Sequence, residues 1–322
     1  MKALVFLLSV ATAFGAVDGT VQNRTSGKPQ AGAMVLLFKI GQAGPEMLAS
    51  TKSDAEGKFS FVQRAEGGPH LLEVAYQGVT YNSMLPPGTP STGLEVSVYD
   101  SSNKPVSARL SQHIVLLEPS PDQLSVSETF FFTNDGNVTW HDPANGTLRF
   151  PVPTAAKATL RVTARAPQGM PVERAAVPAG QPDVYMLNFA IKPGETRIDV
   201  TYSMPITAPG SFSGRLYAKG LPTRFAVPNG VTLSGEGLKS LGQDPNTQAA
   251  IYEVSETSYK VDIQGTGSLR AAENQDAGDD SGPTISQILP RIYDRLSLIL
   301  IPAFLVLALG FILLYRRGEQ RG

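Results

Sequence analysis

The chain contains no cysteine among its 322 residues. It therefore forms no disulfide, has no thiolate nucleophile and offers no Cys ligand for zinc. Charge is also scarce, because charged residues make up 17% of the sequence and the formal net charge is −1. A protein that attracts nucleic acid usually shows a basic patch or a strongly positive balance, so we expect no nucleic-acid partner.

Common catalytic motifs are missing as well. The sequence has no Gly-x-Ser-x-Gly nucleophile elbow, no Gly-Lys-Ser/Thr phosphate loop and no His-Glu-x-x-His zinc motif. We accordingly expect no catalytic, cofactor-binding or metal-binding residues and no cofactor. A hydrolase whose site is not visible in the sequence remains an alternative.

What the chain does contain is apolar residues (42%) together with 31 glycines and 25 prolines. The apolar content is enough to bury a core. The many Gly and Pro residues favour short strands joined by turns over long helices. We therefore predict an all-β fold: two tandem β-sandwich domains, with an N-terminal signal peptide and one C-terminal transmembrane helix.

The N-terminus has the three parts of a secretory signal. Lys2 supplies the charge, Ala3–Val10 is a short apolar stretch, and small residues follow. Cleavage after Ala13 and cleavage after Gly15 both fit, and we assign residues 1–15 to the signal peptide. The alternative is an uncleaved N-terminal helix, since the apolar stretch alone is too short to span a bilayer.

Near the C-terminus lies an apolar run of twenty residues, from Leu296 to Tyr315. As a helix it would be about 30 Å long, which matches the hydrocarbon core of a bilayer. It contains Pro302 and Gly310, both tolerated in membrane helices. We predict a juxtamembrane and transmembrane helix over 288–316 and a cytoplasmic tail over 317–322; the alternative is a buried core helix.

The segment 271–287 precedes this helix and is acidic and polar. Such a composition cannot offset the cost of ordering the chain, so it predicts a flexible linker. If the signal acts, the body of the protein lies outside the cytosol. That would be the periplasmic side of the inner membrane in a Gram-negative cell.

Residues 16–103 alternate as short strands separated by turn signals. Three motifs occur in order: Gly19-x-Val21 with Ser26–Pro29 and Ala31–Leu37, then Ser53-Asp54-x-x-Gly57-x-Phe59-x-Phe61, then Gly68 followed by Leu72-x-Val74-x-Tyr76-x-Gly78. Together they resemble the carboxypeptidase regulatory-like domain of bacterial membrane-anchored proteins, with about 65 residues covered.

The resemblance implies a transthyretin-like sandwich, grouped with carbohydrate-binding-like folds, that acts as an accessory module. In this family the peptidase zinc ligands lie in a separate domain, so the resemblance implies no catalysis. From the residues themselves, Gly57 suits a positive φ at a hairpin turn and Asp54 suits a bond to the turn backbone. Calcium binding by Asp54 and Glu56 is an alternative with too few oxygen ligands.

Residues 104–270 also read as short strands and predict a second β-sandwich. We expect Leu110–Leu117 and Leu124–Thr133 to pair, and the apolar run Thr129–Phe132 to be covered on both faces. Lys192–Glu195 is a hairpin signal between two later strands. The three histidines, at 70, 113 and 141, are too far apart in sequence to suggest a metal site by themselves.

One loop could carry recognition. Asp135 lies in a tight turn, and Trp140, His141 and Asp142 follow it closely. Loops on rigid sandwiches often bind ligands, and the only tryptophan lies here. The alternative is that Trp140 fills the core while Asp142 makes a turn before Pro143.

The sequence thus favours a non-enzymatic, single-pass envelope protein whose extracytoplasmic sandwiches bind or scaffold a protein partner. Its other partner would be the lipid bilayer, through the C-terminal helix. The alternatives are a carbohydrate-binding envelope protein that holds a glycan, and an accessory subunit of a membrane complex. Exposed aromatic rows would favour the glycan, and burial of Tyr76, Tyr81 and Trp140 would weaken it.

Overall fold

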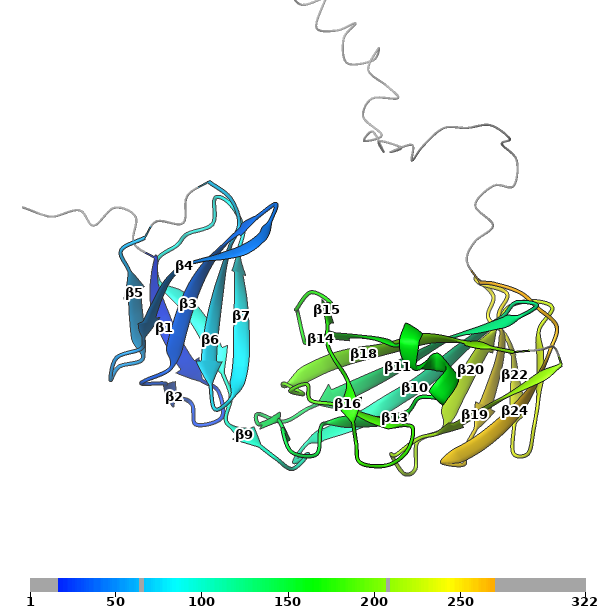
Figure 1. The fold of residues 1–322 in the computed structure, drawn as a ribbon. Coiled ribbons are helices and arrows are strands. Elements are labelled where there is room, and N and C mark those ends of the chain that lie inside the picture. Colours follow the sequence, from blue (N-terminus) through cyan, green and yellow to red (C-terminus); the bar gives the residue numbers. More distant parts are fainter. Residues whose placement is uncertain (1–16, 64–66, 207–208, 270–322) are drawn as a thin grey trace, which may run out of the picture. The chain divides into compact units, whose positions relative to one another are not determined.

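The computed structural model describes residues 17–63, 67–206 and 209–269 (Figure 1). The described part is built from β-sheets, with a single short 3-10 helix at Thr154–Thr159, so the all-β prediction is confirmed. Within these residues no helix has the length and apolarity needed to cross a bilayer. The predicted signal peptide, acidic linker and C-terminal helix, including Leu296, Pro302, Gly310 and Tyr315, lie outside the described residues.

Two separate hydrophobic cores divide the described strands into two groups, one before and one after about residue 103. We call them the N-terminal β-module, residues 17–100, and the C-terminal β-module, residues 108–269. In both cores most of the buried side chains come from alternating strands, and the 3-10 helix adds Ala156 to the second core.

The N-terminal β-module consists of two four-stranded sheets. In the first sheet the central strand is β1 (Val17–Asn23). It pairs antiparallel with β2 (Lys28–Pro29) and β5 (Lys58–Phe61), and parallel with β8 (Leu94–Val98). The second has the order β4 (Gly44–Lys52), β3 (Met34–Gly41), β6 (His70–Tyr76), β7 (Val79–Leu85). Inward-facing residues of both sheets share one core, which includes Val21, Val35, Leu37, Phe59, Leu72 and Tyr81.

The turn before β5 forms as the sequence predicts. Gly57 has φ of 74°, and Asp54 Oδ1 accepts hydrogen bonds from the backbone N–H of Glu56 (3.0 Å) and Lys58 (2.7 Å). The expected hairpin is wrong, however, because β4 and β5 belong to different sheets. The turn instead carries the chain from one sheet to the other.

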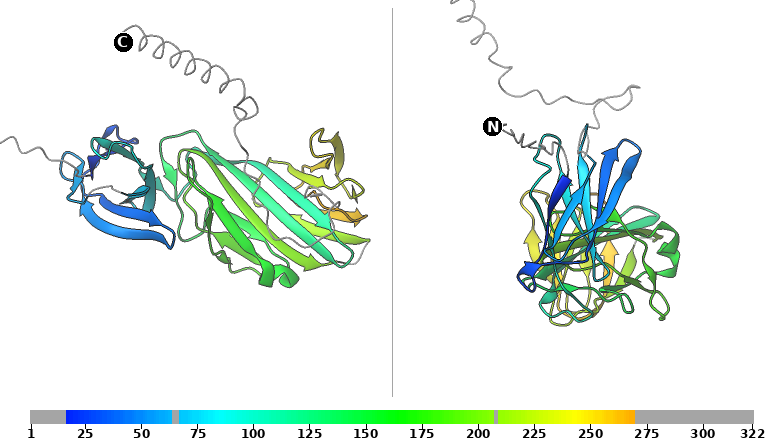
Figure 2. Two further views of the ribbon diagram at one scale, coloured as in Figure 1. Left: turned by 90° about the horizontal axis from the view of Figure 1, so that it is seen from above. Right: turned by 90° about the vertical axis from the view of Figure 1, so that its left-hand side faces the viewer.

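The C-terminal β-module is organised around an eight-stranded sheet. Its order is β15 (Val172–Glu173), β14 (Arg161–Arg165), β18 (Gly194–Pro205), β11 (Gln123–Asn134), β10 (Ala108–Pro119), β20 (Thr223–Val227), β23 (Ala250–Val254), β22 (Lys239–Gln243). The long strands lie side by side in the left-hand view of Figure 2. The predicted pairing of two strands across the turn at Ser120 is confirmed by β10 and β11.

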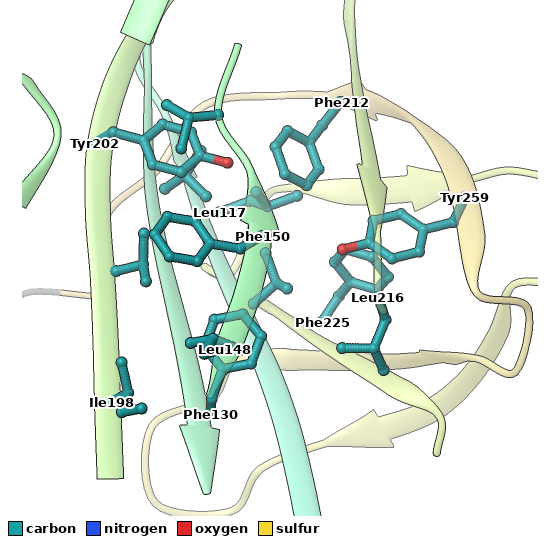
Figure 3. Close-up of a cluster of buried hydrophobic side chains, with 14 of the residues drawn as sticks. Leu117, Phe130, Leu148, Phe150, Ile198, Tyr202, Phe212, Leu216, Phe225 and Tyr259 are labelled. Atoms are coloured by element: carbon teal, nitrogen blue, oxygen red, sulfur yellow. The ribbon is translucent and has the colours of Figure 1, made fainter. Parts of the chain in front are cut away.

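Two three-stranded sheets contribute to the same core. They are β13 (Leu148–Pro151), β17 (Val184–Leu187), β16 (Val177–Pro178), and β19 (Gly210–Arg215), β24 (Ser258–Gln264), β21 (Thr232–Ser234). Figure 3 shows side chains from all three sheets meeting, among them Phe130, Phe150, Tyr202, Phe212 and Tyr259. A further parallel pair, β9 (Ser101–Ser102) with β12 (Thr139–Trp140), connects the chain on either side of the predicted domain boundary.

One expectation for this module is wrong and a second is correct only in part. The segment at Lys192–Glu195 does not close a hairpin, since β17 pairs with β13 while β18 pairs with β11 and β14. The run Thr129–Phe132 is fully buried on one face only. On its other face the ring of Phe131 is partly exposed and lies 5.7 Å from the Arg197 guanidinium carbon, so a long polar side chain covers it.

Residues of the two modules contact each other at Tyr81. Its hydroxyl donates to the backbone oxygen of Tyr99 (2.8 Å) and lies 3.0 Å from Thr139 Oγ1, with both side chains buried. Lys192 Nζ lies 4.9 Å from the centre of the Tyr81 ring and donates to the backbone oxygen of Thr80. These polar contacts satisfy groups that burial would otherwise leave unpaired.

Candidate binding pocket beside Trp140

The loop that leads to Trp140 is fixed by Asn134, the last residue of β11. Its side chain is 2% exposed and donates to the backbone oxygens of Val138 (2.8 Å) and Ile191 (3.0 Å). It also accepts from the N–H of Gly136 (3.2 Å). One buried amide therefore holds both ends of the tight turn that the sequence predicts at 134–137.

Trp140 is held by its own backbone. Its N–H donates to Ile191 O (3.1 Å) and its oxygen accepts from Ile191 N–H (2.9 Å), which forms an isolated antiparallel bridge. The indole is partly buried, packs against the core, and lies 6.2 Å from the Phe132 ring centre. Its Nε1 is buried and has no hydrogen-bond partner among the described residues. An indole N–H in such a position usually has a partner, so this donor is an exception in the fold.

Beside the indole is a pocket of about 200 Å³. Its walls are mostly apolar and come from segments far apart in the chain. They are Pro105, Ala108, Arg109, Leu110, Phe132, Trp140, Thr147, Leu148, Arg149, Leu216, Tyr217 and Ala218. Leu148 and Leu216 also belong to the hydrophobic core drawn in Figure 3, so the pocket lies directly against that core.

The charged groups that line the pocket are both arginines. Arg109 Nη1 lies 2.6 Å from Asp135 Oδ2, and the two side chains are 60% and 63% exposed. Arg149 donates from Nε to the backbone oxygen of Asn145 (3.2 Å), and no carboxylate of the described residues lies within 4.0 Å of it. A third guanidinium, that of Arg215, lies 5.4 Å from the ring centre of Tyr217.

The structure separates the four residues of the predicted binding loop. Trp140 lines the pocket. Asp135 does not line it, but forms an ion pair with Arg109, which does. The backbone N–H of His141 donates to Ser102 O (2.8 Å). Asp142 Oδ1 accepts from the N–H groups of Ala144 and Asn145, as the turn alternative requires. Hydrogen bonds from Asn145 hold the pKa of Asp142 below its usual range.

Among the residues that line the pocket only Trp140 was predicted, and the side chains of Arg109, Arg149 and Tyr217 are the unanticipated ones most able to bind a ligand. The two arginines lie on or beside strands and look like ordinary solvent-facing positions. Tyr217 follows β19 and is separated from Trp140 by more than seventy residues of sequence. Nothing in local sequence indicates that these side chains meet.

A second polar cluster lies inside the core. His113 Nδ1 is 2.9 Å from Thr223 Oγ1, and His113 Nε2 is 3.1 Å from Glu128 Oε2. Tyr202 donates to the other oxygen of Glu128 (2.9 Å). This order of hydroxyl, imidazole and carboxylate is also found in hydrolases, but none of the four side chains is more than 4% exposed. A substrate could not reach the hydroxyl, so we interpret the cluster as structural.

Burial also affects the pKa of two tyrosines, Tyr202 of this cluster and the core residue Tyr259, which responds to the charge of Glu128. Desolvation, and secondly the charge of Glu128, raises the pKa of Tyr202 and of Tyr259 well above the usual value. Both phenols therefore stay protonated, and Tyr202 remains a hydrogen-bond donor to the carboxylate.

No group of three metal-ligating side chains occurs among the described residues. An expectation that the sequence holds no His-x-x-Glu spacing of zinc ligands is wrong, because His70-x-x-Glu73 occurs in β6. Residues three apart on a strand point to opposite faces, and His70 is buried while Glu73 is partly exposed. His70 Nδ1 instead lies 3.0 Å from the backbone oxygen of Gly68.

Comparisons with known proteins give no family. No family model matches the chain, and no curated protein matches it. Solved structures that match include the M1 zinc metallopeptidase from Deinococcus radiodurans and a mutant of it, each at 11% identity and a TM-score of 0.27. A two-domain M1 zinc metallopeptidase mutant bound to L-tryptophan matches at 11% identity and a TM-score of 0.28.

These matches cover 49% of this chain, and the chain spans less than half the length of the matched structures, 42% to 43%. At TM-scores below 0.5 they carry no argument about fold or activity. The pocket and the buried cluster therefore have to be interpreted from their own geometry.

Proposed function

We propose that this chain is a non-enzymatic, single-pass envelope protein whose two extracytoplasmic β-sandwiches bind or scaffold a protein partner. Residues 16–103 would be a carboxypeptidase regulatory-like module and residues 104–270 the second sandwich. The two separate hydrophobic cores support this division. The apolar run 296–315 would anchor the body on the periplasmic side.

The observation that carries the binding role is the pocket beside Trp140. It combines a mostly apolar hollow with two aromatic side chains, Trp140 and Tyr217, and with two arginines in its lining. Tryptophan, tyrosine and arginine are the residues that most often dominate binding energy at protein interfaces. Strands and backbone bridges hold these groups in place, so little ordering would be needed on binding.

The carbohydrate-binding alternative receives less support. Flat aromatic rings exposed in a row would be needed for stacking on sugars. Tyr81 is 4% exposed, and Tyr76 is partly buried with its hydroxyl bonded to Asp100 (2.9 Å). Trp140 is partly buried at the wall of a pocket that is too small for a saccharide chain.

A hydrolase would require titratable groups that converge in an accessible cleft. The residues that line the Trp140 pocket include no carboxylate and no imidazole. An accessory subunit of a membrane complex would use this pocket in the same way as a scaffold protein. The identity of the captured partner therefore distinguishes these two functions.

The placement in the membrane is tested by fractionation of cells that produce the full chain. We expect the protein to stay in the membrane pellet after a carbonate wash, and the mature N-terminus to begin after residue 13 or 15. A carbonate-soluble protein with an intact N-terminus would contradict the proposal.

The binding role is tested by crosslinking in intact membranes followed by purification. Wild-type protein should recover one stoichiometric protein partner, and Tyr217→Ala, which alters the pocket wall, should recover much less. Met170→Ala is the matched control, because Met170 is 68% exposed and does not line the pocket. Equal recovery by all three proteins would show that the partner binds elsewhere, and recovery of glycan alone would favour the carbohydrate alternative.

A further inference from the structure

We propose that the Trp140 pocket receives a single bulky apolar side chain presented by an acidic, extended peptide segment of the partner. This inference rests on the proposed function and specifies the chemistry of what is bound. Three properties of the pocket lead to it: its volume, its apolar walls and its charge.

The volume decides what kind of group fits. Pockets for drug-sized ligands and cofactors usually measure about 300–1,000 Å³. The volume here is about 200 Å³, somewhat more than the roughly 150 Å³ of an apolar cavity that holds one benzene molecule. One leucine-sized or phenylalanine-sized side chain therefore fills the pocket, whereas a cofactor or an oligosaccharide does not fit.

The walls favour an apolar group. Phe132, Leu148 and Leu216 offer carbon surface continuous with the core. The indole of Trp140, 6.2 Å from the Phe132 ring centre, adds aromatic surface to the same wall. An apolar side chain that enters the hollow therefore removes its own surface and that of the walls from water.

Charge complementarity selects an acidic segment. The pocket is lined by Arg109 and Arg149, has Arg215 next to Tyr217, and includes no acidic residue in its lining. Arg109 pairs with Asp135, but this exposed ion pair is worth little and can exchange for a partner's carboxylate. Arg149 forms no ion pair in the part of the chain that the structure describes. The Asp142 carboxylate acts on Arg149 only through its charge and is hydrogen-bonded within its own turn, so the fork-shaped guanidinium remains suited to a partner's carboxylate.

Trp140 is the only tryptophan of the chain, so its fluorescence reports on this pocket alone. We would titrate full-length protein in detergent micelles with a capped nonapeptide that has a central leucine flanked by two acidic residues on each side. One matched peptide has alanine at the centre, and another has lysines in place of the acidic residues. Excitation is at a wavelength that tyrosine does not absorb.

The leucine peptide should give a saturable shift of the Trp140 emission. Its apparent Kd should be lower by about tenfold or more than that of either matched peptide. Raising the salt concentration should weaken binding, because Arg109 and Arg215 are exposed and Arg149 is only partly buried. Arg149→Gln should weaken binding by about tenfold. Arg161→Gln should leave it unchanged, since Arg161 is exposed on β14 and does not line the pocket.

Absence of a saturable change up to millimolar peptide, or equal binding of the alanine or lysine peptide, would overturn the inference. The acidic residues of this chain's own 271–287 segment are another candidate occupant. If neutralising Glu273, Asp276, Asp279 and Asp280 shifts the Trp140 emission without added peptide, the pocket belongs to that segment and the inference is wrong.

The crosslinking experiment distinguishes an error in the proposed ligand chemistry from an error in the proposed binding role of the pocket. If the peptide fails while Tyr217→Ala still abolishes capture of a partner, only the acidic and apolar ligand chemistry is wrong. If the peptide fails and capture does not depend on Tyr217, the pocket is not a binding site and the proposed function fails with it.

Discussion

His113 Nε2 lies 3.1 Å from Glu128 Oε2 inside the core of the C-terminal β-module, where the two residues are 1% and 3% exposed. They come from neighbouring strands β10 and β11, and the imidazole stacks on Phe130 with ring centres 4.4 Å apart. Glu128 occupies a position in β11 whose neighbours on the same face, Val126 and Phe130, are apolar. A carboxylate is tolerated there because each of its oxygens has a hydrogen-bonded partner.

We expect Glu128→Ala to lower the free energy of unfolding of the C-terminal β-module by about 3–5 kcal/mol, because it leaves His113 buried without its partner. The emission of Trp140 in a urea titration measures this module. Replacing both residues with apolar side chains, as in His113→Phe with Glu128→Leu, should cost less than the single change.

Glu173→Gln is the matched control for this change. The side chain of Glu173 is 71% exposed and lies 3.9 Å from Arg161, so its loss should alter stability by less than about 1 kcal/mol. A single variant Glu128→Ala as stable as the control would mean that the buried cluster contributes nothing to the fold.

Lys192 should make stability depend on pH. Burial, the main cause, lowers the pKa of Lys192 to about 8, with Glu73 opposing and Arg174 adding to the shift. Between pH 8 and 10 the folded protein has released this proton while the unfolded chain keeps it, so stability rises with pH. The rise is at most about 3 kcal/mol.

Melting temperatures measured at pH 8, 9 and 10 test this prediction. In Lys192→Met the rise should shrink, because the titrating group is gone. Lys260→Met, at an exposed position of β24, should behave like the wild type. A rise that is the same in all three proteins would assign the pH dependence to other groups.

Gly57→Ala should destabilise the N-terminal β-module by about 2–4 kcal/mol, because a Cβ is disfavoured at φ of 74° and would also lie 2.9 Å from Val21 O. Gly27→Ala is a close control. Gly27 has φ of 69°, but a Cβ there meets nothing within 4 Å, so only the conformational cost of about 1–2 kcal/mol applies. Thermal unfolding followed by far-UV circular dichroism measures the stability of both variants. Equal losses of stability would show that the steric clash at Gly57 is relieved.

Asn134→Ala should loosen the loop before Trp140, since it removes the amide that bonds to Val138 and Ile191. We expect a loss of about 1–3 kcal/mol and a red shift of the Trp140 emission. Asn137→Ala is the control, because Asn137 lies in the same loop and is exposed. Identical emission spectra for the two variants would contradict a role of Asn134 in positioning the indole.

The features of the fold that depend on neighbouring residues could be predicted from the sequence. In β5 the residues Phe59 and Phe61 are buried while Lys58 and Ser60 are exposed, as the alternation indicates. The pairing of β10 with β11 follows from two long alternating strands and a short turn. The φ of Gly57 follows from the Asp and Gly of its turn.

Pairing between distant strands could not be predicted in this way. The turn signal at Lys192–Glu195 is present, yet β17 and β18 pair in different sheets, because the apolar faces that each strand buries belong to different layers. Likewise, nothing local distinguishes Glu128 from an exposed glutamate. Its burial depends on His113, Tyr202 and the register of three neighbouring strands.

The sequence by itself determined the β-rich class of this protein, its turns and the single tryptophan near a loop, because strand alternation and turn chemistry are properties of neighbouring residues. Only the tertiary structure decided that Arg109, Trp140 and Tyr217 share one pocket while Asp142 closes a turn. Such a pocket is formed by contacts between segments far apart in the chain, and the packing of whole sheets brings those segments together.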